Sequence, residues 1–422
     1  MNNIDPQSKQ IEFECSSCST RLRVRAAMAE GSEVQCPRCK HLNRVQPETA
    51  TQSPPETAPI AEPDAGIINA DMATPVSPSQ RTPAAPPADA PINVQSPTKV
   101  EGRDTPTRQL YGRITEEISK LFVGQEELVL GTLVALFSGG HVLIESVPGL
   151  GKTLFVRTLG KVLGCEFGRI QFTADLMPSD ITGAPIFNMK TQEFDFRAGP
   201  VFTQLLLADE INRSPAKTHA ALLEIMQEKN VTVDGKTHEL SPPFLVMATQ
   251  NPIESEGTYN LPEAQLDRFM FKLVADYPSE NEEADILMLH STQVDLDRRL
   301  ENEINQITSP EEIIEMTNGN SEVRIDPLLV QYINKVVRLT RSWPQFYMGA
   351  SPRAGIGLMQ AARTLAAFYG RDYAVPDDVV SLALPTLRHR VMLTAEAEVE
   401  GQSVDRLLTD MLRSIEVPRI KS

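Results

Sequence analysis

Three scarcities limit what this 422-residue chain can be. It has no run of 18 or more apolar residues, the length that a helix needs to cross a membrane. It begins with MNNIDPQSKQ, which is polar and lacks the apolar stretch of a secretory signal, so we expect the protein in the cytoplasm. Positive charge is also scarce: the formal net charge is −16. This argues against a surface that wraps nucleic acid, although a local basic patch stays open.

Cysteine is the third scarcity, and four of the five cysteines lie close together. They form two C-x-x-C pairs separated by 17 residues, Cys15 with Cys18 and Cys36 with Cys39. In a cytosolic protein this pattern indicates a metal site before a disulfide. Four thiolates suit tetrahedral Zn²⁺, and so small a unit hardly folds without its metal. Two redox pairs are the alternative, but no thioredoxin-like pattern surrounds them. The fifth, Cys165, we expect to be a small core or surface residue.

Composition divides the chain into four stretches. Residues 1–46 predict a zinc-ribbon-like domain, because IEFEC and TRLRVR alternate like short strands. Residues 47–104 predict a disordered linker: 12 of the 32 prolines fall between 47 and 100, in a stretch too polar to bury a core. In residues 105–278, strands and helices alternate, which predicts an α/β core with a parallel sheet covered on both faces. Residues 279–422 show no convincing strand and predict an all-helical domain, with helix caps such as Asp326-Pro327 and Ser351-Pro352.

A phosphate-binding loop is predicted at residues 146–153. The strand HVLIE leads into SVPGLGKT, which matches G-x-x-x-x-G-K-[ST] except for a serine at the first position. Gly149 and Gly151 would let backbone N–H groups point at phosphate oxygens. Lys152 would neutralise the β- and γ-phosphates, and the Thr153 hydroxyl would hold Mg²⁺. Pro148 and Leu150 complete the loop. The alternative is a chance glycine turn with a surface lysine.

Acidic side chains follow the next buried strand. LLLA at residues 205–208 leads to Asp209 and Glu210, and ligands of open α/β sheets bind at the carboxyl ends of strands. Asp209 would order Mg²⁺, and Glu210 would polarise the attacking water. The alternative is a solvated strand end. A further strand at residues 244–249 precedes Asn251, which could contact the γ-phosphate and the water, although an asparagine before proline is usually a turn former.

These segments together resemble a MoxR-family AAA+ ATPase over residues 106–422. The strings that carry the resemblance are VGQEE (123–127), VPGLGKT (147–153), RIQFTADLMPSDITG (169–183), AGPVF (198–202), LLLADEINR (205–213), ALLEIMQE (221–228), ATQNP (248–252), PEAQLDRF (262–269) and GASPRA (349–354). They keep the family's order. The resemblance implies a P-loop core with a helical lid, and ATP and Mg²⁺ as cofactors.

Roles follow from the resemblance residue by residue. Gln125 would line the adenine pocket, Lys152 and Thr153 would belong to Walker A, and Asp209 with Glu210 to Walker B. Asn251 would be sensor 1.

Two arginines gain weight from the same resemblance, although a single arginine is more often a surface charge. Arg268 resembles the arginine finger that is offered to a neighbouring subunit's ATP. Arg353 resembles sensor 2, which reaches back from the lid. An arginine supplied in trans implies a ring, and the family is usually hexameric. The sequence departs from the family at Ser146, where a serine with φ > 0 would be strained, and at Ala174, where proline is common.

The resemblance implies a chaperone-like motor that remodels or matures partner complexes, often with a protein that carries a von Willebrand factor A domain. Such a partner would be a separate chain. The zinc unit is locally basic, with Arg21, Arg23, Arg25, Arg38, Lys40 and Arg44. We favour protein docking for it, with contact to DNA or RNA as the alternative. A non-catalytic nucleotide-binding scaffold is the third class, against which the intact Glu210, Asn251 and Arg268 argue.

Overall fold

The computed structural model describes residues 102–251, 259, 261–291 and 296–418, together with four short strands nearer the N-terminus. The chain divides into two compact units, Met1–Pro87 and Ala88–Ser422. In the first unit, β1 (Gln10–Glu14) pairs antiparallel with β2 (Arg21–Arg25), and β3 (Glu33–Gln35) with β4 (Leu42–Arg44). The four paired cysteines and residues 47–101 of the linker lie outside the described residues.

The second unit begins with the α/β part. Its elements in chain order are α1 (Pro106–Ser119), α2 (Glu126–Phe137), β5 (Val142–Ser146), α3 (Lys152–Leu163), β6 (Phe167–Gln171), α4 (Pro178–Thr182), β7 (Gly183–Asn188), β8 (Glu193–Ala198), β9 (Leu205–Asp209), the 3-10 turn η2 (Ile211–Arg213), α5 (Ala216–Glu228), β10 (Asn230–Val233), β11 (Lys236–Glu239), β12 (Leu245–Gln250), α6 (Glu263–Leu266) and β13 (Phe271–Ala275).

A mostly helical part follows, which we call the lid. Its elements are α7 (Glu280–Ser291), α8 (Leu296–Glu303), α9 (Pro310–Asn320), α10 (Pro327–Thr340), β14 (Phe346–Met348), α11 (Pro352–Phe368), α12 (Pro376–Leu387), β15 (Met392–Leu393), α13 (Ala395–Val399) and α14 (Val404–Arg413).

The central sheet is parallel throughout, with the strand order β13-β5-β12-β9-β6. Successive side chains of a strand point to opposite faces. Leu205 and Leu207 of β9 accordingly join one hydrophobic cluster with α2 and α3, whereas Leu206 and Ala208 join a second cluster with α5. Both faces are therefore covered, which confirms the predicted α/β class. Among the described helices, none is both long and apolar enough to span a bilayer.

The lid contains one feature that the sequence did not predict. Its helices begin at the expected caps: the Asp326 side chain accepts a hydrogen bond at the start of α10, and the Ser351 side chain does so at the start of α11. However, β14 and β15 pair antiparallel within it. The expectation of an all-helical domain was wrong in this detail, because strands of three and two residues are too short to show alternation.

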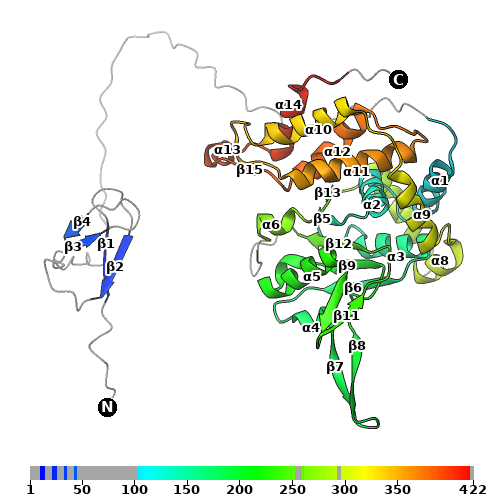
Figure 1. Ribbon diagram of the computed structural model, residues 1–422, viewed down its shortest axis with the longest axis horizontal. Helices are drawn as coiled ribbons and strands as arrows, with labels where there is room; N and C mark the ends of the chain where they lie inside the picture. The colour runs from blue at the N-terminus through cyan, green and yellow to red at the C-terminus, as the bar shows by residue number, and fades with distance from the viewer. Residues whose placement is uncertain are drawn as a thin grey trace, which may run out of the picture. The chain divides into compact units, whose positions relative to one another are not determined.

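The lid shares its hydrophobic core with the sheet. One cluster of buried residues runs from the sheet through α1 and α2 into α11 and α12. The Phe368 ring of α11 stacks on Tyr111 at 4.5 Å between centroids and meets Phe137 edge to face at 5.4 Å. Figure 1 shows the lid helices lying over this side of the core. Packing thus fixes the lid against α1 and α2. The domain boundary that we placed after residue 278 stays a prediction.

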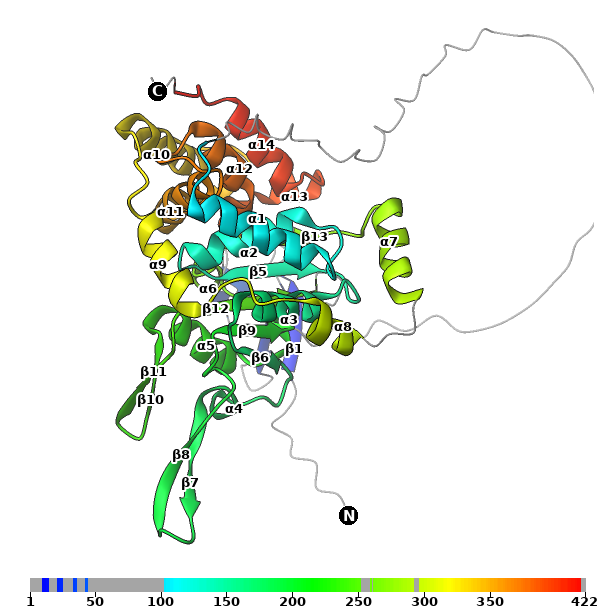
Figure 2. The ribbon, with the colours of Figure 1, turned by 90° about the vertical axis from the view of Figure 1, so that its right-hand side faces the viewer.

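Two antiparallel hairpins project from the core, β7–β8 and β10–β11 (Figures 1 and 2). Phe196 of β8 stacks on His238 of β11 with ring centroids 4.1 Å apart, so an aromatic contact joins them. Farther along β7–β8, Phe187 and Phe194 remain 49% and 69% exposed. Figure 2 shows α7 standing apart from the packed helices of the lid.

Candidate nucleotide site and a basic pocket

The candidate nucleotide residues gather at one edge of the sheet. Since all five strands run in the same direction, their carboxyl ends meet at that edge. β5 ends there at Ser146 and continues into the phosphate loop, β9 ends at Asp209, and β12 ends next to Asn251. Asn251 is 7% exposed, and Lys152 and Thr153 are half-buried. The fold therefore brings together the loop, the paired acids and the amide that the sequence singled out.

The phosphate loop has the backbone geometry that an anion site needs. Gly149 and Gly151 adopt φ of +88° and +73°, a region that side chains rarely enter. A Cβ on Gly149 would meet nothing within 4 Å, so the space beside the loop is open. Helix α3 begins at Lys152, and the N–H groups of its first turn are available to phosphate oxygens.

Ser146 causes no backbone strain. It is the last residue of β5, pairs with Ala275 of β13, and is absent from the described residues with positive φ. The strain expected from its replacement of glycine therefore does not arise, because this position is still extended strand. The side chain is 2% exposed, and its hydroxyl has no hydrogen-bond partner among the described residues.

Both acidic side chains at the end of β9 are held by neighbours. The Thr249 hydroxyl and the Arg169 guanidinium each donate to the Asp209 carboxylate, both at 2.7 Å. Gln171 Nε2 donates to Glu210 Oε2 at 2.7 Å. Glu210 also has φ of +56°, and such backbone strain is typical of functional positions. The two carboxylates are thus fixed by the protein itself.

Arg169 and Gln171 are site residues that the sequence argument missed. Both lie on β6, two residues apart and so on the same face, and β6 pairs with β9 in the register Gln171↔Asp209. The string RIQF gave a strand but not its neighbour in the sheet. Only the strand order shows that its polar side chains face the two acids.

The residue expected near the adenine also has an unusual backbone. Gln125 adopts a left-handed φ of +55°, directly before α2. Its Nε2 donates to the Asp276 carbonyl at 3.4 Å, whereas its Oε1 is buried without a partner among the described residues. A buried amide oxygen with no donor is available to a ligand.

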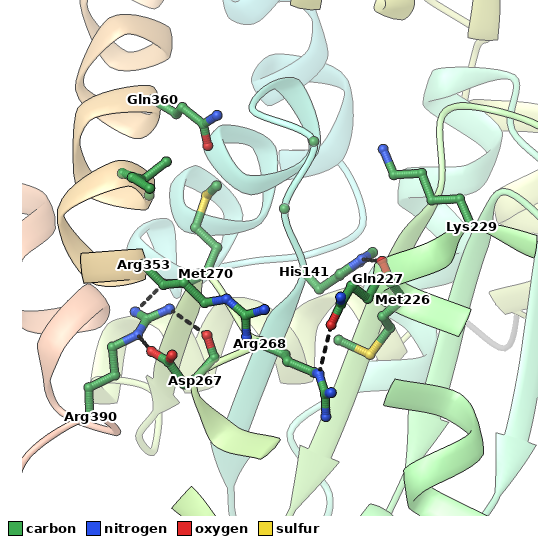
Figure 3. Close-up of a pocket in the computed structure, with 14 residues that line it drawn as sticks. His141, Met226, Gln227, Lys229, Asp267, Arg268, Met270, Arg353, Gln360 and Arg390 are labelled. Atoms are coloured by element: carbon green, nitrogen blue, oxygen red, sulfur yellow. Dashed lines mark hydrogen bonds and ion pairs between the residues drawn. The ribbon is translucent and has the colours of Figure 1, made fainter. Parts of the chain in front are cut away.

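A basic pocket of about 290 Å³ lies at the opposite edge of the sheet. It is lined by residues 139–141, which precede β5, and by Lys229, Arg268 and Arg353 (Figure 3). Arg268 donates from Nε to Gln227 Oε1 at 3.4 Å. The His141 ring is buried there: it accepts from the Val246 N–H at Nδ1 (3.1 Å), so Nε2 carries the proton and donates to the Met226 carbonyl.

The two candidate arginines therefore lie together and away from Lys152. The pocket adjoins the amino end of β5, and the phosphate loop follows its carboxyl end. Five residues of strand at ~3.3 Å each separate the two ends by about 16 Å, more than the length of an arginine side chain. The resemblance implied that Arg353 reaches its own phosphate loop, but the structure does not place it there. Helix α11, which carries Arg353, begins on the side of the amino edge.

A parallel five-stranded sheet with a phosphate loop, paired acids at its carboxyl edge and a lid defines an AAA+ ATPase, and this site suits ATP and Mg²⁺. The family model for the ATPase family associated with various cellular activities (AAA) matches residues 141–271, and the AAA lid domain matches residues 338–411.

Individual relatives match roughly three quarters of the chain. Chaperone MoxR1 of Mycobacterium tuberculosis is 42% identical over 344 residues, which are 79% of this chain and 89% of MoxR1. The uncharacterized protein YeaC of Bacillus subtilis is 47% identical over 309 residues, 73% of this chain and 95% of YeaC. The crystal structure of a predicted ATPase from Cytophaga hutchinsonii is 40% identical, with a TM-score of 0.68 over 74% of this chain and 96% of that one. The chain belongs to the MoxR family of AAA+ ATPases.

Proposed function

We propose that this ATPase is a chaperone-like motor that works as a ring and remodels or matures partner protein complexes. The observation that carries the ring is the placement of Arg268 and Arg353 in one pocket at the edge away from the chain's own phosphate loop. The motor role is supported by the similarity to a relative named as a chaperone.

Each residue at the carboxyl edge has a part in the proposed reaction. Lys152 and the N–H groups of the loop bind the phosphates, and Thr153 and Asp209 hold Mg²⁺. Glu210 orients and polarises the attacking water, and Asn251 contacts the γ-phosphate. Gln125 contacts the adenine. Mg²⁺ adds charge neutralisation at the phosphates.

Arg268 and Arg353 act on the ATP of a neighbouring subunit. Negative charge develops on the phosphoryl oxygens during transfer, so cations placed there stabilise the transition state more than the bound substrate. Neither arginine can serve its own site across the length of β5. A closed ring gives every site a donor of these two cations, and we propose the hexamer that is usual in the family.

The ring is tested by mixing two inactive variants, Arg268→Ala and Lys152→Ala, under conditions where subunits exchange. In a mixed ring, a Lys152→Ala subunit can supply Arg268 to the intact phosphate loop of its neighbour. Recovered ATP hydrolysis is the expected result. If native mass spectrometry shows mixed rings and no activity returns, action in trans is ruled out.

The N-terminal unit is proposed to be a zinc ribbon that docks partner proteins. Each C-x-x-C pair falls in the connection of one hairpin, Cys15 and Cys18 between β1 and β2, and Cys36 and Cys39 between β3 and β4. Two C-x-x-C pairs that supply four thiolates are suited to one tetrahedral Zn²⁺.

The client is proposed to be a protein, with a von Willebrand factor A domain protein as the partner. The basic residues of the ribbon keep a second candidate in view, an ATPase that contacts DNA or RNA. ATP turnover is measured with DNA, with RNA and with a purified partner of this class. If only the partner protein accelerates ATP turnover, the remodelling of protein complexes is supported. If only DNA or RNA does so, the nucleic-acid function is supported.

A further inference from the structure

Asp267 stands between the two arginines of the basic pocket. It precedes Arg268 in the chain, and its Oδ2 accepts a hydrogen bond from the Ser351 hydroxyl at 2.8 Å. Ser351 is the N-cap of α11, and its hydroxyl also accepts from the Arg353 N–H at 3.1 Å. One carboxylate thus links the core segment that carries Arg268 to the lid helix that carries Arg353.

Arg390 fixes this carboxylate from behind, as Figure 3 shows. Its Nε donates to Asp267 Oδ1 at 2.8 Å, and its Nη2 donates to the Phe269 carbonyl at 2.6 Å. Its Nη1 donates to the carbonyls of Met270 and Thr386. The Arg390 side chain is 4% exposed. A buried guanidinium with this many acceptors has a single orientation, and it imposes that orientation on Asp267.

We infer that Asp267 and Arg390 are positioning residues that hold Arg268 and Arg353 at a fixed spacing for the triphosphate of a neighbouring subunit. This inference rests on the proposed ring. Without the link, two like charges on separate elements would repel each other and move independently. Preorganised cations stabilise a transition state because they need no rearrangement during the reaction.

The rival explanation is a buried ion pair that only stabilises the fold, and the chain offers a matched control. Arg371 and Asp378 form another buried pair in the lid, both 3% exposed, with the closest contact at 2.7 Å. Neither residue lines the basic pocket. Asp378→Asn therefore removes a carboxylate that pairs with a buried arginine, as Asp267→Asn does, and leaves Arg268 and Arg353 untouched. The Asp378 side chain is the more deeply buried of the two, 3% exposed against 19% for Asp267.

The experiment compares Asp267→Asn with Asp378→Asn in the full-length protein. We expect Asp267→Asn to bind ATP at its own site with the affinity of the unaltered protein. Its turnover should fall roughly 10- to 100-fold, since small misplacements of catalytic groups cost this much. Asp378→Asn should lose at least as much thermal stability as Asp267→Asn and keep its turnover.

Mixing then separates positioning from simple loss of structure. Asp267→Asn should regain activity with Lys152→Ala, whose intact arginine pair serves the Asp267→Asn site. It should not regain activity with Arg268→Ala, because neither subunit then offers an intact pair. No recovery with Lys152→Ala, while Arg268→Ala recovers with the same partner, overturns this inference and leaves the ring standing. If Arg268→Ala also fails to recover, the proposed ring itself has failed.

A milder variant keeps the inference testable if Asp267→Asn does not fold. Ser351→Gly removes the hydroxyl that Asp267 accepts from, and glycine is tolerated at a helix N-cap. We expect a several-fold lower turnover with unchanged ATP affinity, and rescue by Ser351→Thr, which restores a hydroxyl. Full activity of a folded Ser351→Gly protein would contradict the link between Asp267 and α11.

Discussion

The two edges of the central sheet are built in different ways. At the carboxyl edge, Lys152, Asp209 and Asn251 each lie at the end of a strand or in the loop that follows it, so they come from short motifs. At the amino edge, the pocket combines residues from five distant stretches, among them residues 139–141, Lys229 and Arg390. The first edge serves the chain's own nucleotide through local geometry. The second depends on how the lid packs against the core.

Charge also differs between the edges. At the carboxyl edge, acids and bases are paired within the site, as in Arg169 with Asp209 and Arg213 with Glu210. The residues that line the amino-edge pocket include four cations but a single acid, Asp267. This acid already forms an ion pair with Arg390. A pocket with a surplus of positive charge is suited to a phosphate that comes from elsewhere.

The largest expected effect concerns the carboxyl edge itself. Lys152→Ala removes the counter-charge of the phosphates and should abolish ATP binding. Glu210→Gln keeps the shape of the side chain but loses the carboxylate, so ATP should bind and persist, with turnover at least ~10²-fold lower. Retention of labelled nucleotide after gel filtration distinguishes the two. Turnover at the normal rate in Glu210→Gln would refute its catalytic assignment.

A change at the amino edge should leave nucleotide binding intact, which is the sharpest contrast between the edges. For Arg353→Ala we expect ATP affinity close to that of the unaltered protein and hydrolysis roughly 10²-fold lower, below the 10³–10⁵ range of strong arginine fingers. Calorimetric titration and steady-state turnover measure the two quantities. If ATP affinity drops as far as turnover, Arg353 serves its own site after all.

Acid should weaken the amino edge through His141. Burial lowers the pKa of this histidine from 6.5 to about 4. Between these values the unfolded chain binds a proton that the folded chain refuses, so this contribution to stability is complete above pH 6.5 and lost as the pH falls towards 4. The loss amounts to about 3 kcal/mol at 1.36 kcal/mol per unit. Urea unfolding of the protein and of His141→Asn at several pH values measures this loss. If the free energy of unfolding changed equally with pH in both proteins, His141 would not be its source.

Arg169→Gln should have a smaller effect at the carboxyl edge. The variant removes a positive charge that pairs with Asp209, the proposed Mg²⁺ residue. We expect the Mg²⁺ concentration for half-maximal hydrolysis to fall several-fold, because the cation no longer competes with a guanidinium. Lys190→Gln, on the exposed turn of β7–β8, serves as the control. An unchanged or higher Mg²⁺ requirement would count against the competition.

The smallest effect on turnover should follow removal of the N-terminal unit. A chain that begins at Val100 keeps the hydrogen bonds from the Gly102 and Arg103 N–H groups to the carbonyls of Tyr369 and Gly370. This shortened chain should hydrolyse ATP at close to the normal rate.

The full-length protein should hold about one zinc ion per chain, and the Cys15→Ser/Cys18→Ser variant should lose it. Elemental analysis that finds no zinc would exclude the ribbon.

The sequence by itself determined the carboxyl edge of the site. Glycine positions, a lysine at a helix start and acids after an apolar run are local patterns, since parallel strands bring their carboxyl ends together wherever they lie in the sheet. The same local logic predicted the caps at Asp326 and Ser351. The sequence left open whether Ser146 needs a positive φ, because a motif does not say where a strand ends.

Only the tertiary structure decided the rest. The neighbour of β6 in the sheet placed Gln171 against Glu210, and the packing of α11 on the core placed Arg353 beside Arg268. The first pair of residues is about 40 positions apart in the chain and the second about 85. Burial of apolar faces brings the elements of each pair together, and many sequences can supply such faces. Hydrophobic contact is not directional, so a linear pattern indicates that a helix packs but not which residue its first turn meets.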